Sequence, residues 1–281
     1  MTDALNVLSA TAIMIIVASG LALILGLMNV INLAHPASMA IGAYAMLVAA
    51  GQGTGFWGGV VAGAVAAGIV GLGIEMLIIR RLYDRPFDTI LATWGIALVV
   101  SQVITIIFGR APKPVDAPMT GILTIAGISY SEYRLTLMGV AVLLVVALAA
   151  VARYTKWGLI ARAVMANESL AAGLGINTRT VRRVTFVFGS ALGGIAGALI
   201  APLSTITPMV GFGYLIPAFL AVLLSGSAIL GLVAAALIVA GGDSLFSRFI
   251  SAIFSMAFVT IIVISVLRFF TNGFERLRRI A

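Results

Sequence analysis

A polar interruption near the N-terminus reads Gly26-Leu27-Met28-Asn29-Val30-Ile31-Asn32-Leu33-Ala34-His35-Pro36-Ala37-Ser38, and the sequence on both sides is almost entirely apolar. No Asp, Glu, Lys or Arg occurs between Asp3 and Glu75. Amides, an imidazole and a helix-breaking proline are costly in a lipid bilayer unless protein groups or water satisfy the polar atoms. Two interpretations stay open: the interruption lines a cavity or pathway at membrane depth, or it is a tight interfacial turn between two spans.

The composition of the chain determines its class. Of 281 residues, 62% are hydrophobic and only 9% are charged, and the mean hydropathy is +1.20. A globular domain carries about 25% charged residues. We therefore expect an all-α, polytopic membrane protein that forms a single transmembrane domain over residues 1–281. The N-terminus has no basic region ahead of its apolar run, so we expect no cleaved signal peptide.

Charge and residue types exclude several functions. The net charge of +8 comes from basic residues that lie between apolar segments, which indicates membrane topology and anionic headgroups rather than nucleic acid. The chain has no Cys and one His, so we predict neither disulfides nor a metal site. It has no phosphate-binding loop, zinc-protease motif or nucleophile elbow. We therefore predict no catalytic residue, and any energy source must be another chain.

Apolar segments long enough to cross a bilayer predict about eight to nine transmembrane helices, some of them short or broken. The expected spans are 5–27, 36–50 (a short one), 57–79, 89–108, 135–152, 184–202, 214–240 and 249–270. In the third, Gly59, Gly63, Ala67 and Gly71 recur every four residues, which predicts tight helix contact. Ser225-Gly226-Ser227 interrupts 214–240, so one span and two half-helices are both plausible there.

The basic residues predict which loops are cytoplasmic. The loops at 80–88 and 153–183 and the tail with Arg276, Arg278 and Arg279 should lie inside, and the charge-balanced loop at 109–133 should lie outside. Three spans precede Arg80, so the N-terminus should be outside and the number of crossings odd. Counting 214–240 once gives eight, so either that segment crosses twice or one span is wrong. A turn is expected at Gly241-Gly242-Asp243.

Few acidic residues are available at membrane depth. We expect Glu75 to offset Arg80 or Arg81, which follow it by a little over one helical turn. A proton- or sodium-coupled carrier usually needs a buried carboxylate, and the sequence offers no convincing candidate.

The cytoplasmic segment 153–183 contains a second informative pattern. Residues 158–172 predict one short helix whose apolar side consists of Leu159, Ala163, Val164 and Leu170. Gly173 and Gly175 can end this helix, and Asn177 or Thr178 can cap the next one. A short, partly apolar helix between two spans suits docking into a groove on a partner. The alternative is an interfacial helix that lies among the lipid headgroups.

Several motifs together resemble a known family. They are Gly20-Leu21, Gly26 through His35, Gly42-Ala43-Tyr44, Gly158 through Ala163, Ala171 through Asn177, and Gly189 to Pro202. These residues resemble the permeases of branched-chain amino acid ABC importers over most of the chain. The chain departs from that family's usual pattern in having Pro36 after His35, and in reading Leu224-Ser225-Gly226-Ser227-Ala228-Ile229-Leu230-Gly231 where a glycine-rich turn is common.

The resemblance implies a permease in the bacterial inner membrane, paired with a second, identical or homologous permease, two cytoplasmic ATPases and a soluble binding protein. ATP and magnesium would bind to the ATPases, and this chain would hold no cofactor. Residues near the translocation path would be Asn29, Asn32, His35 and Ser38. Residues that couple to the ATPase would be Arg162, Glu168, Ala171, Ala172, Gly173, Gly175 and Asn177.

The substrate implied is a small polar or zwitterionic solute, most simply an amino acid, with urea or a short amide as the alternative. Two other classes remain: an ion-coupled carrier or channel, which would transport without nucleotide, and a membrane-embedded enzyme, for which no catalytic constellation is present.

Overall fold

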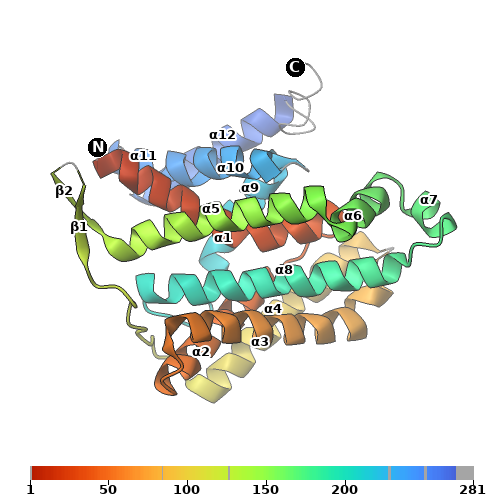
Figure 1. Cartoon of the computed structure of the whole chain (residues 1–281), viewed down its shortest axis with the longest axis horizontal. Helices are drawn as coiled ribbons and strands as arrows, with labels where there is room; N and C mark the ends of the chain where they lie inside the picture. Colours follow the sequence, from red (N-terminus) through yellow and green to blue (C-terminus); the bar gives the residue numbers. More distant parts are fainter. Residues whose placement is uncertain (1, 84, 126, 227–228, 250–251, 270–281) are drawn as a thin grey trace. The chain divides into compact units, whose positions relative to one another are not determined.

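The structure is a computed structural model that describes residues 2–83, 85–125, 127–226, 229–249 and 252–269. Nearly all regular structure in these ranges is helical, which confirms the all-α, polytopic class (Figure 1). Within the described residues, six stretches are long and apolar enough to cross a membrane. They are α1 (Thr2–Met28), α3 (Gly55–Leu77) with the 3-10 turn η1 (Ile79–Arg81), α4 (Pro86–Phe108), α5 (Glu132–Tyr154), α8 (Thr178–Ile200) with η2 (Ala201–Leu203), and α10 (Ile229–Ala236) continued by η3 (Leu237–Gly241) and α11 (Gly242–Phe249).

Shorter helices complete the described chain. They are α2 (His35–Gly51), α6 (Lys156–Ala166), α7 (Glu168–Gly173), α9 (Phe212–Ser225) and α12 (Ala252–Phe269). Pro36 lies in the first turn of α2, where its missing N–H leaves no bond unmade, as expected. With 17 residues, α2 is also as short as the sequence indicated. The number of eight to nine crossings stays a prediction.

In the C-terminal third, the structure decides between the two alternatives for 214–240 and differs from the expected turn that follows. Segment 214–240 is not one helix, because α9 ends at Ser225 and α10 begins at Ile229. The expected turn at Gly241-Gly242-Asp243 is wrong: the chain passes through one π-helical turn, η3, and continues as α11. A π turn accommodates an extra residue without ending the helix. Gly241 also permits close contact, since a Cβ there would lie 3.1 Å from Cγ1 of Val7.

The loop at 109–133 contains structure that the sequence did not predict. Strands β1 (Ile122–Ile125) and β2 (Ile128–Ser131) pair antiparallel, with Ile122 opposite Ser131 and Ile125 opposite Ile128. Gly127 in the turn has φ +82°, which suits glycine.

The chain divides into two compact units. Unit 1 comprises Met1–Ala18, Ala117–Ala147 and Ile216–Ala281, and unit 2 comprises Ser19–Asp116 and Leu148–Leu215. In unit 1 the Tyr130 hydroxyl donates a hydrogen bond to the Leu5 carbonyl oxygen at 3.0 Å. The expectation of a single permease domain over 1–281 stays a prediction.

Unit 2 is built around α2, α3 and α8, which pack on one another (Figure 1). Gly63 lies opposite Gly194 and Ala198, whereas Gly71 lies opposite Ser190, so α3 and α8 run antiparallel. A Cβ on Gly42 would overlap the backbone of Gly194. The spacing of small residues in α3 therefore produced the tight contact that the sequence predicted.

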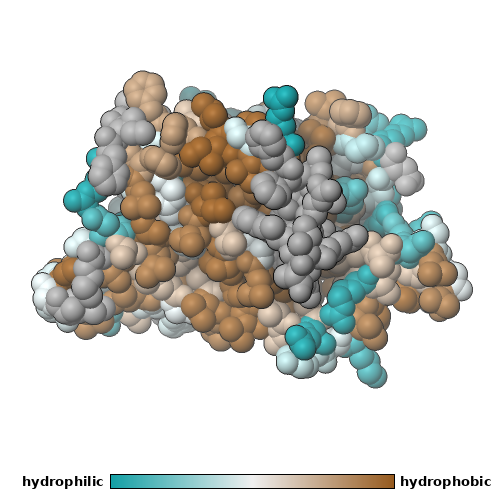
Figure 2. Space-filling model, turned by 90° about the horizontal axis from the view of Figure 1, so that it is seen from above, coloured by the Kyte–Doolittle hydropathy of each residue, from teal (hydrophilic) through white to brown (hydrophobic). Residues whose placement is uncertain are grey.

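Large apolar side chains remain exposed on the long helices. Leu91 and Ile106 on α4 and Leu143 on α5 are all more than two-thirds exposed. Figure 2 shows one face of the molecule, on which hydrophobic side chains predominate and hydrophilic ones gather mainly near the margins. Such a surface is unfavourable in water and suits contact with lipid.

Candidate functional site

Segment 153–183, for which a cytoplasmic location is predicted, contains two helices where one was predicted. Asn167 interrupts 158–172 in an extended conformation, with φ −162°, and separates α6 from α7. Its Oδ1 accepts a hydrogen bond from the Leu170 N–H at 2.9 Å. The single-helix expectation is wrong because asparagine is among the most favourable N-cap residues, and the cap starts a new helix there.

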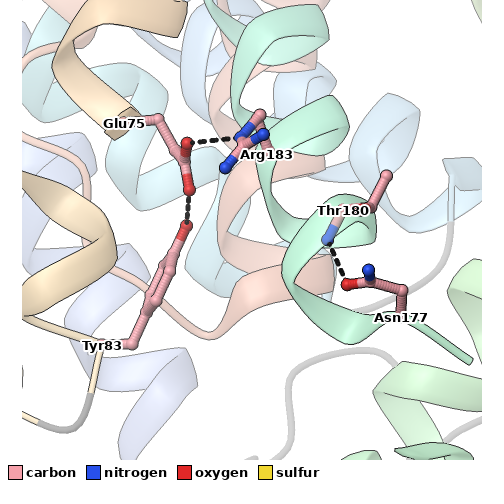
Figure 3. A network of polar contacts seen from close by, with 5 residues as sticks. All are labelled: Glu75, Tyr83, Asn177, Thr180 and Arg183. Carbon is pink, nitrogen blue, oxygen red and sulfur yellow. Dashed lines mark hydrogen bonds and ion pairs between the residues drawn. The ribbon is translucent and has the colours of Figure 1, made fainter. Parts of the chain in front are cut away.

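The end of α7 and the start of α8 lie where the sequence predicts them. Helix α7 ends at Gly173, and Gly175 has φ +86°, the left-handed conformation that glycine tolerates. Oδ1 of Asn177 accepts a hydrogen bond from the Thr180 N–H at 3.1 Å, which confirms Asn177 as the cap of α8 (Figure 3).

Of the predicted apolar side, Val164 is buried, Ala163 is partly buried, and Leu159 and Leu170 are exposed. Val164 and Ala171 are buried and form a small core with Val181 of α8. Leu159 and Leu170 are each 62% exposed. Other large hydrophobic side chains that are exposed in this segment include Tyr154, Trp157, Met165 and Leu174. The buried side chains therefore hold α6 and α7 against α8, and the exposed ones are available for contact with lipid or a partner.

The charged and small residues of the predicted coupling set lie in different surroundings. Glu168, in the first turn of α7, forms an ion pair with Arg182 of α8. The Arg162 guanidinium donates a hydrogen bond to the Ala152 carbonyl oxygen. Four other members of the set are exposed: Ala172, Gly173, Gly175 and Asn177. Their role in coupling stays a prediction.

A buried carboxylate lies beside this segment, at the end of α3. Glu75 is 2% exposed, and its Oε2 accepts a hydrogen bond from Nε of Arg183 at 3.1 Å. The Tyr83 hydroxyl donates to Oε1 of Glu75 at 3.1 Å (Figure 3). The expected pairing of Glu75 with Arg80 or Arg81 is wrong. Both arginines are exposed, whereas Glu75 faces α8.

Tyr83 connects this carboxylate to the Glu168–Arg182 pair. The Arg182 guanidinium carbon lies 4.4 Å from the centre of the Tyr83 ring, a cation–π geometry. Burial, together with the negative charge of Glu75, raises the pKa of the Tyr83 hydroxyl well above its usual value of 10. Tyr83 therefore stays neutral and remains a hydrogen-bond donor at physiological pH.

Sequence reasoning missed Tyr83 and the pairing of Arg183, although one signal was present. Glu75 continues the four-residue series of Gly59, Gly63, Ala67 and Gly71, so it lies on the same face of α3 as the small residues. That face packs against α8, which brings the carboxylate to a basic side chain there.

The N-terminal interruption lies between α1 and α2. Asn29 is exposed and has φ +50°, a left-handed conformation that asparagine adopts more readily than most residues. Asn32 is buried, and its Oδ1 accepts a hydrogen bond from the Ala34 N–H at 3.0 Å. The Leu33 N–H donates to Oγ1 of Thr93 in α4 at 3.1 Å. These bonds satisfy backbone groups that no helix satisfies.

His35 and Ser38 lie in the glycine-rich packing of unit 2. A Cβ on Gly193 would lie 3.1 Å from Cε1 of His35 and 2.9 Å from Cβ of Ser38. A Cβ on Gly20 would lie 3.1 Å from the same His35 atom. Both side chains thus pack against Gly193 of α8, and His35 also packs against Gly20 of α1. That Asn29, Asn32, His35 and Ser38 lie near a translocation path stays a prediction.

The apolar spans and the glycine-packed helices define the class of the chain, a multi-pass helical membrane protein. Comparison with known families narrows the class. The family model described as "Branched-chain amino acid transport system / permease component" matches residues 4–267. The chain belongs to this family. In general, members of the family are permeases and not enzymes, and they work with ATPase and binding-protein partners.

Curated relatives agree with this assignment. A high-affinity branched-chain amino acid transport system permease protein LivH from Escherichia coli K12 is 28% identical over 254 residues, which is 84% of this chain and 82% of the relative. LivH of Salmonella typhimurium is 27% identical with the same coverage. A probable branched-chain amino acid transport permease from Methanocaldococcus jannaschii is 31% identical over 121 residues, 43% of this chain and 38% of that protein.

Proposed function

We propose that this chain is one membrane subunit of a binding-protein-dependent ABC importer, and that it carries branched-chain or other amino acids across the bacterial inner membrane. The partners would be a second permease, two cytoplasmic ATPases that bind ATP and magnesium, and a soluble binding protein. The observation that carries the proposal is the family match across residues 4–267.

Docking to an ATPase is the part of the proposal that this chain's surface supports. Leu159 and Leu170 are exposed on two short helices that Val164 and Ala171 hold against α8. Exposed apolar anchors on a helix are the usual means by which a helix binds a groove. The anchoring of α6 and α7 to α8 would keep them in place when an ATPase binds.

The helix count supports a topology for this subunit. If α2, α9 and α12 also cross the membrane, the described chain has nine crossings, counted with the six longer stretches. Nine is odd, as the distribution of basic residues requires for an outside N-terminus and an inside tail. The break between α9 and α10 supplies the additional crossing that a single span at 214–240 could not.

Purification and transport test the function together. The tagged chain is extracted from its native host in mild detergent, and its co-purifying partners are identified by mass spectrometry. The isolated complex is then reconstituted in liposomes with the binding protein and ATP. We expect two ATPases, a second permease and ATP-dependent uptake of radiolabelled leucine. Uptake of urea and not of leucine would show that the substrate is an amide. A chain that purifies alone and transports without ATP would contradict the assignment as an ABC importer.

A matched pair of variants tests the docking surface. Leu170→Ser should reduce ATPase co-purification several-fold, because it removes an exposed apolar anchor. Leu123→Ser, on the exposed strand β1, should leave ATPase binding unchanged. Equal retention of the ATPase by both variants would contradict docking through α7.

A further inference from the structure

We propose that Tyr83 and Glu75 are positioning residues that connect the cytoplasmic helix α7 to the transmembrane helix α3, so that movement of α7 changes how α3 and α8 pack. The inference rests on the proposed function, since it names the side chains through which ATPase docking would act on the spans. All the residues involved lie in unit 2.

The contacts form a continuous series of five side chains. Glu168 on α7 pairs with Arg182, and the Arg182 guanidinium lies over the Tyr83 ring at 4.4 Å. The Tyr83 hydroxyl donates to Glu75 on α3 at 3.1 Å, and Glu75 accepts a second hydrogen bond from Arg183 at 3.1 Å. Tyr83 lies after η1, between the spans of α3 and α4, so a loop residue joins the two charged pairs.

The two charged pairs differ in burial. The Glu75 side chain is 2% exposed and that of its partner Arg183 is 38% exposed, so the difference lies in the buried carboxylate, which loss of either partner would leave poorly compensated. The side chains of Arg182 and Glu168 are 20% and 38% exposed, and solvent weakens such a pair. The contact to Glu75 on α3 should therefore be hard to break. The contact to Glu168 on α7, where the ATPase would bind, should break more easily.

The polar series is not needed to bring α3 and α8 together. Small residues already close the α3–α8 contact at Gly63, Gly71 and Gly194. A buried ion pair is often no more stabilising than apolar residues of the same volume, but its geometry is specific. Arg182 and Arg183 are neighbours on α8, and each contacts a different part of the series. A shift of Arg182 with α7 would thus change the position of Tyr83, the donor to Glu75.

The test uses the complete complex of permeases, ATPases and binding protein. Tyr83→Phe removes the hydroxyl and keeps the ring beneath Arg182. We expect the ratio of ATPase rates with and without substrate-loaded binding protein, per bound ATPase, to fall about fivefold, the factor that corresponds to one net hydrogen bond. Tyr130→Phe is the matched control, because it removes a tyrosine hydrogen bond in unit 1, and it should keep the wild-type ratio.

A double-mutant cycle separates a connected series from independent effects. Glu168→Gln should also lower the ratio, and Tyr83→Phe combined with Glu168→Gln should be no lower than the worse single variant. Independent residues would give the product of the two effects. A product, or a wild-type ratio for Tyr83→Phe, would overturn the inference. If Tyr83→Phe does not assemble, Glu75→Gln takes its place in the same cycle with the same expected outcomes.

The controls distinguish this inference from the function on which it rests. A wild-type chain without bound ATPases, or without stimulation by the loaded binding protein, would contradict the importer itself. A stimulated wild-type complex with an indifferent Tyr83→Phe variant would contradict only the connection from α7 to α3. A purely structural role would lower complex yield and thermal stability while the ratio per bound ATPase stayed unchanged, which would also overturn the inference.

Discussion

The two ends of the α3–α8 pair are joined by different physical means. Toward the start of α3, Gly63 meets Gly194 and Ala198, and backbones approach because no side chain lies between them. At the other end, Glu75 meets Arg183, and opposite charges join the same two helices. The first contact requires residues without a large side chain, and the second requires the buried carboxylate of Glu75. One series of residues spaced by four thus supplies both a steric and an electrostatic contact.

The largest effect should follow from removing the cation at the charged end. Arg183→Ala leaves the buried Glu75 carboxylate without its ionic partner, which we expect to destabilise the protein by about 3–5 kcal/mol. Arg179→Ala, in the exposed first turn of α8, should change stability by less than about 0.5 kcal/mol. Thermal unfolding midpoints in detergent measure both. Similar midpoints for the two variants would show that the charged contact contributes little.

A smaller effect is expected at the steric contact. Gly71→Ala places a Cβ against the Ser190 side chain and should destabilise by about 1–3 kcal/mol. Gly73→Ala, two residues further on the same helix, meets no atom within 4 Å and should be neutral or stabilising by up to about 1 kcal/mol.

The same thermal measurement provides a rescue for that pair. Ser190→Gly combined with Gly71→Ala restores the space, so its midpoint should return toward the wild-type value. If Gly71→Ala is as stable as Gly73→Ala, the backbones of α3 and α8 are not in close contact at this level.

The smallest effect should come from the start of α8, next to the charged end. Asn177→Ala removes the cap on the Thr180 N–H and should destabilise by about 1 kcal/mol. Asn177→Ser retains a side-chain acceptor and should lose much less. Thermal unfolding again distinguishes them, and equal losses for the two variants would exclude the cap as the cause. An Asn177→Ala loss as large as that of Arg183→Ala would mean that the charged contact requires an ordered first turn of α8.

Local signals predicted much of this structure from the sequence. Pro36 indicated the start of α2, Asn177 capped α8, and the glycines of α3 indicated close packing, because each acts through its own backbone or helix face. Asn167 carried an equally local signal for a helix start, which the apolar pattern of 158–172 obscured.

Partners distant in sequence were not predictable in the same way. Glu75 and Arg183 are 108 residues apart. Their pairing depends on which helix faces α3, and Arg80 and Arg81 were nearer along the chain. The π turn at η3 was not predicted because it is an irregularity within an apolar run. The β1–β2 hairpin was not predicted because it lies in a loop that the sequence analysis identified only by its polar residues.

The glycine contacts also have a mechanical consequence. Helices joined backbone to backbone have few side-chain rotamers to rearrange, so a change in the packing of α3 and α8 should take the form of a tilt of one whole helix against the other. Helix α8 has 23 residues and, at 1.5 Å per residue, is about 34 Å long. A tilt of about 5° at Arg182 would therefore move Gly197, which lies about 22 Å further along α8, by roughly 2 Å. Helix α8 would thus convert a small rotation at its Arg182 end into a larger displacement at its opposite end.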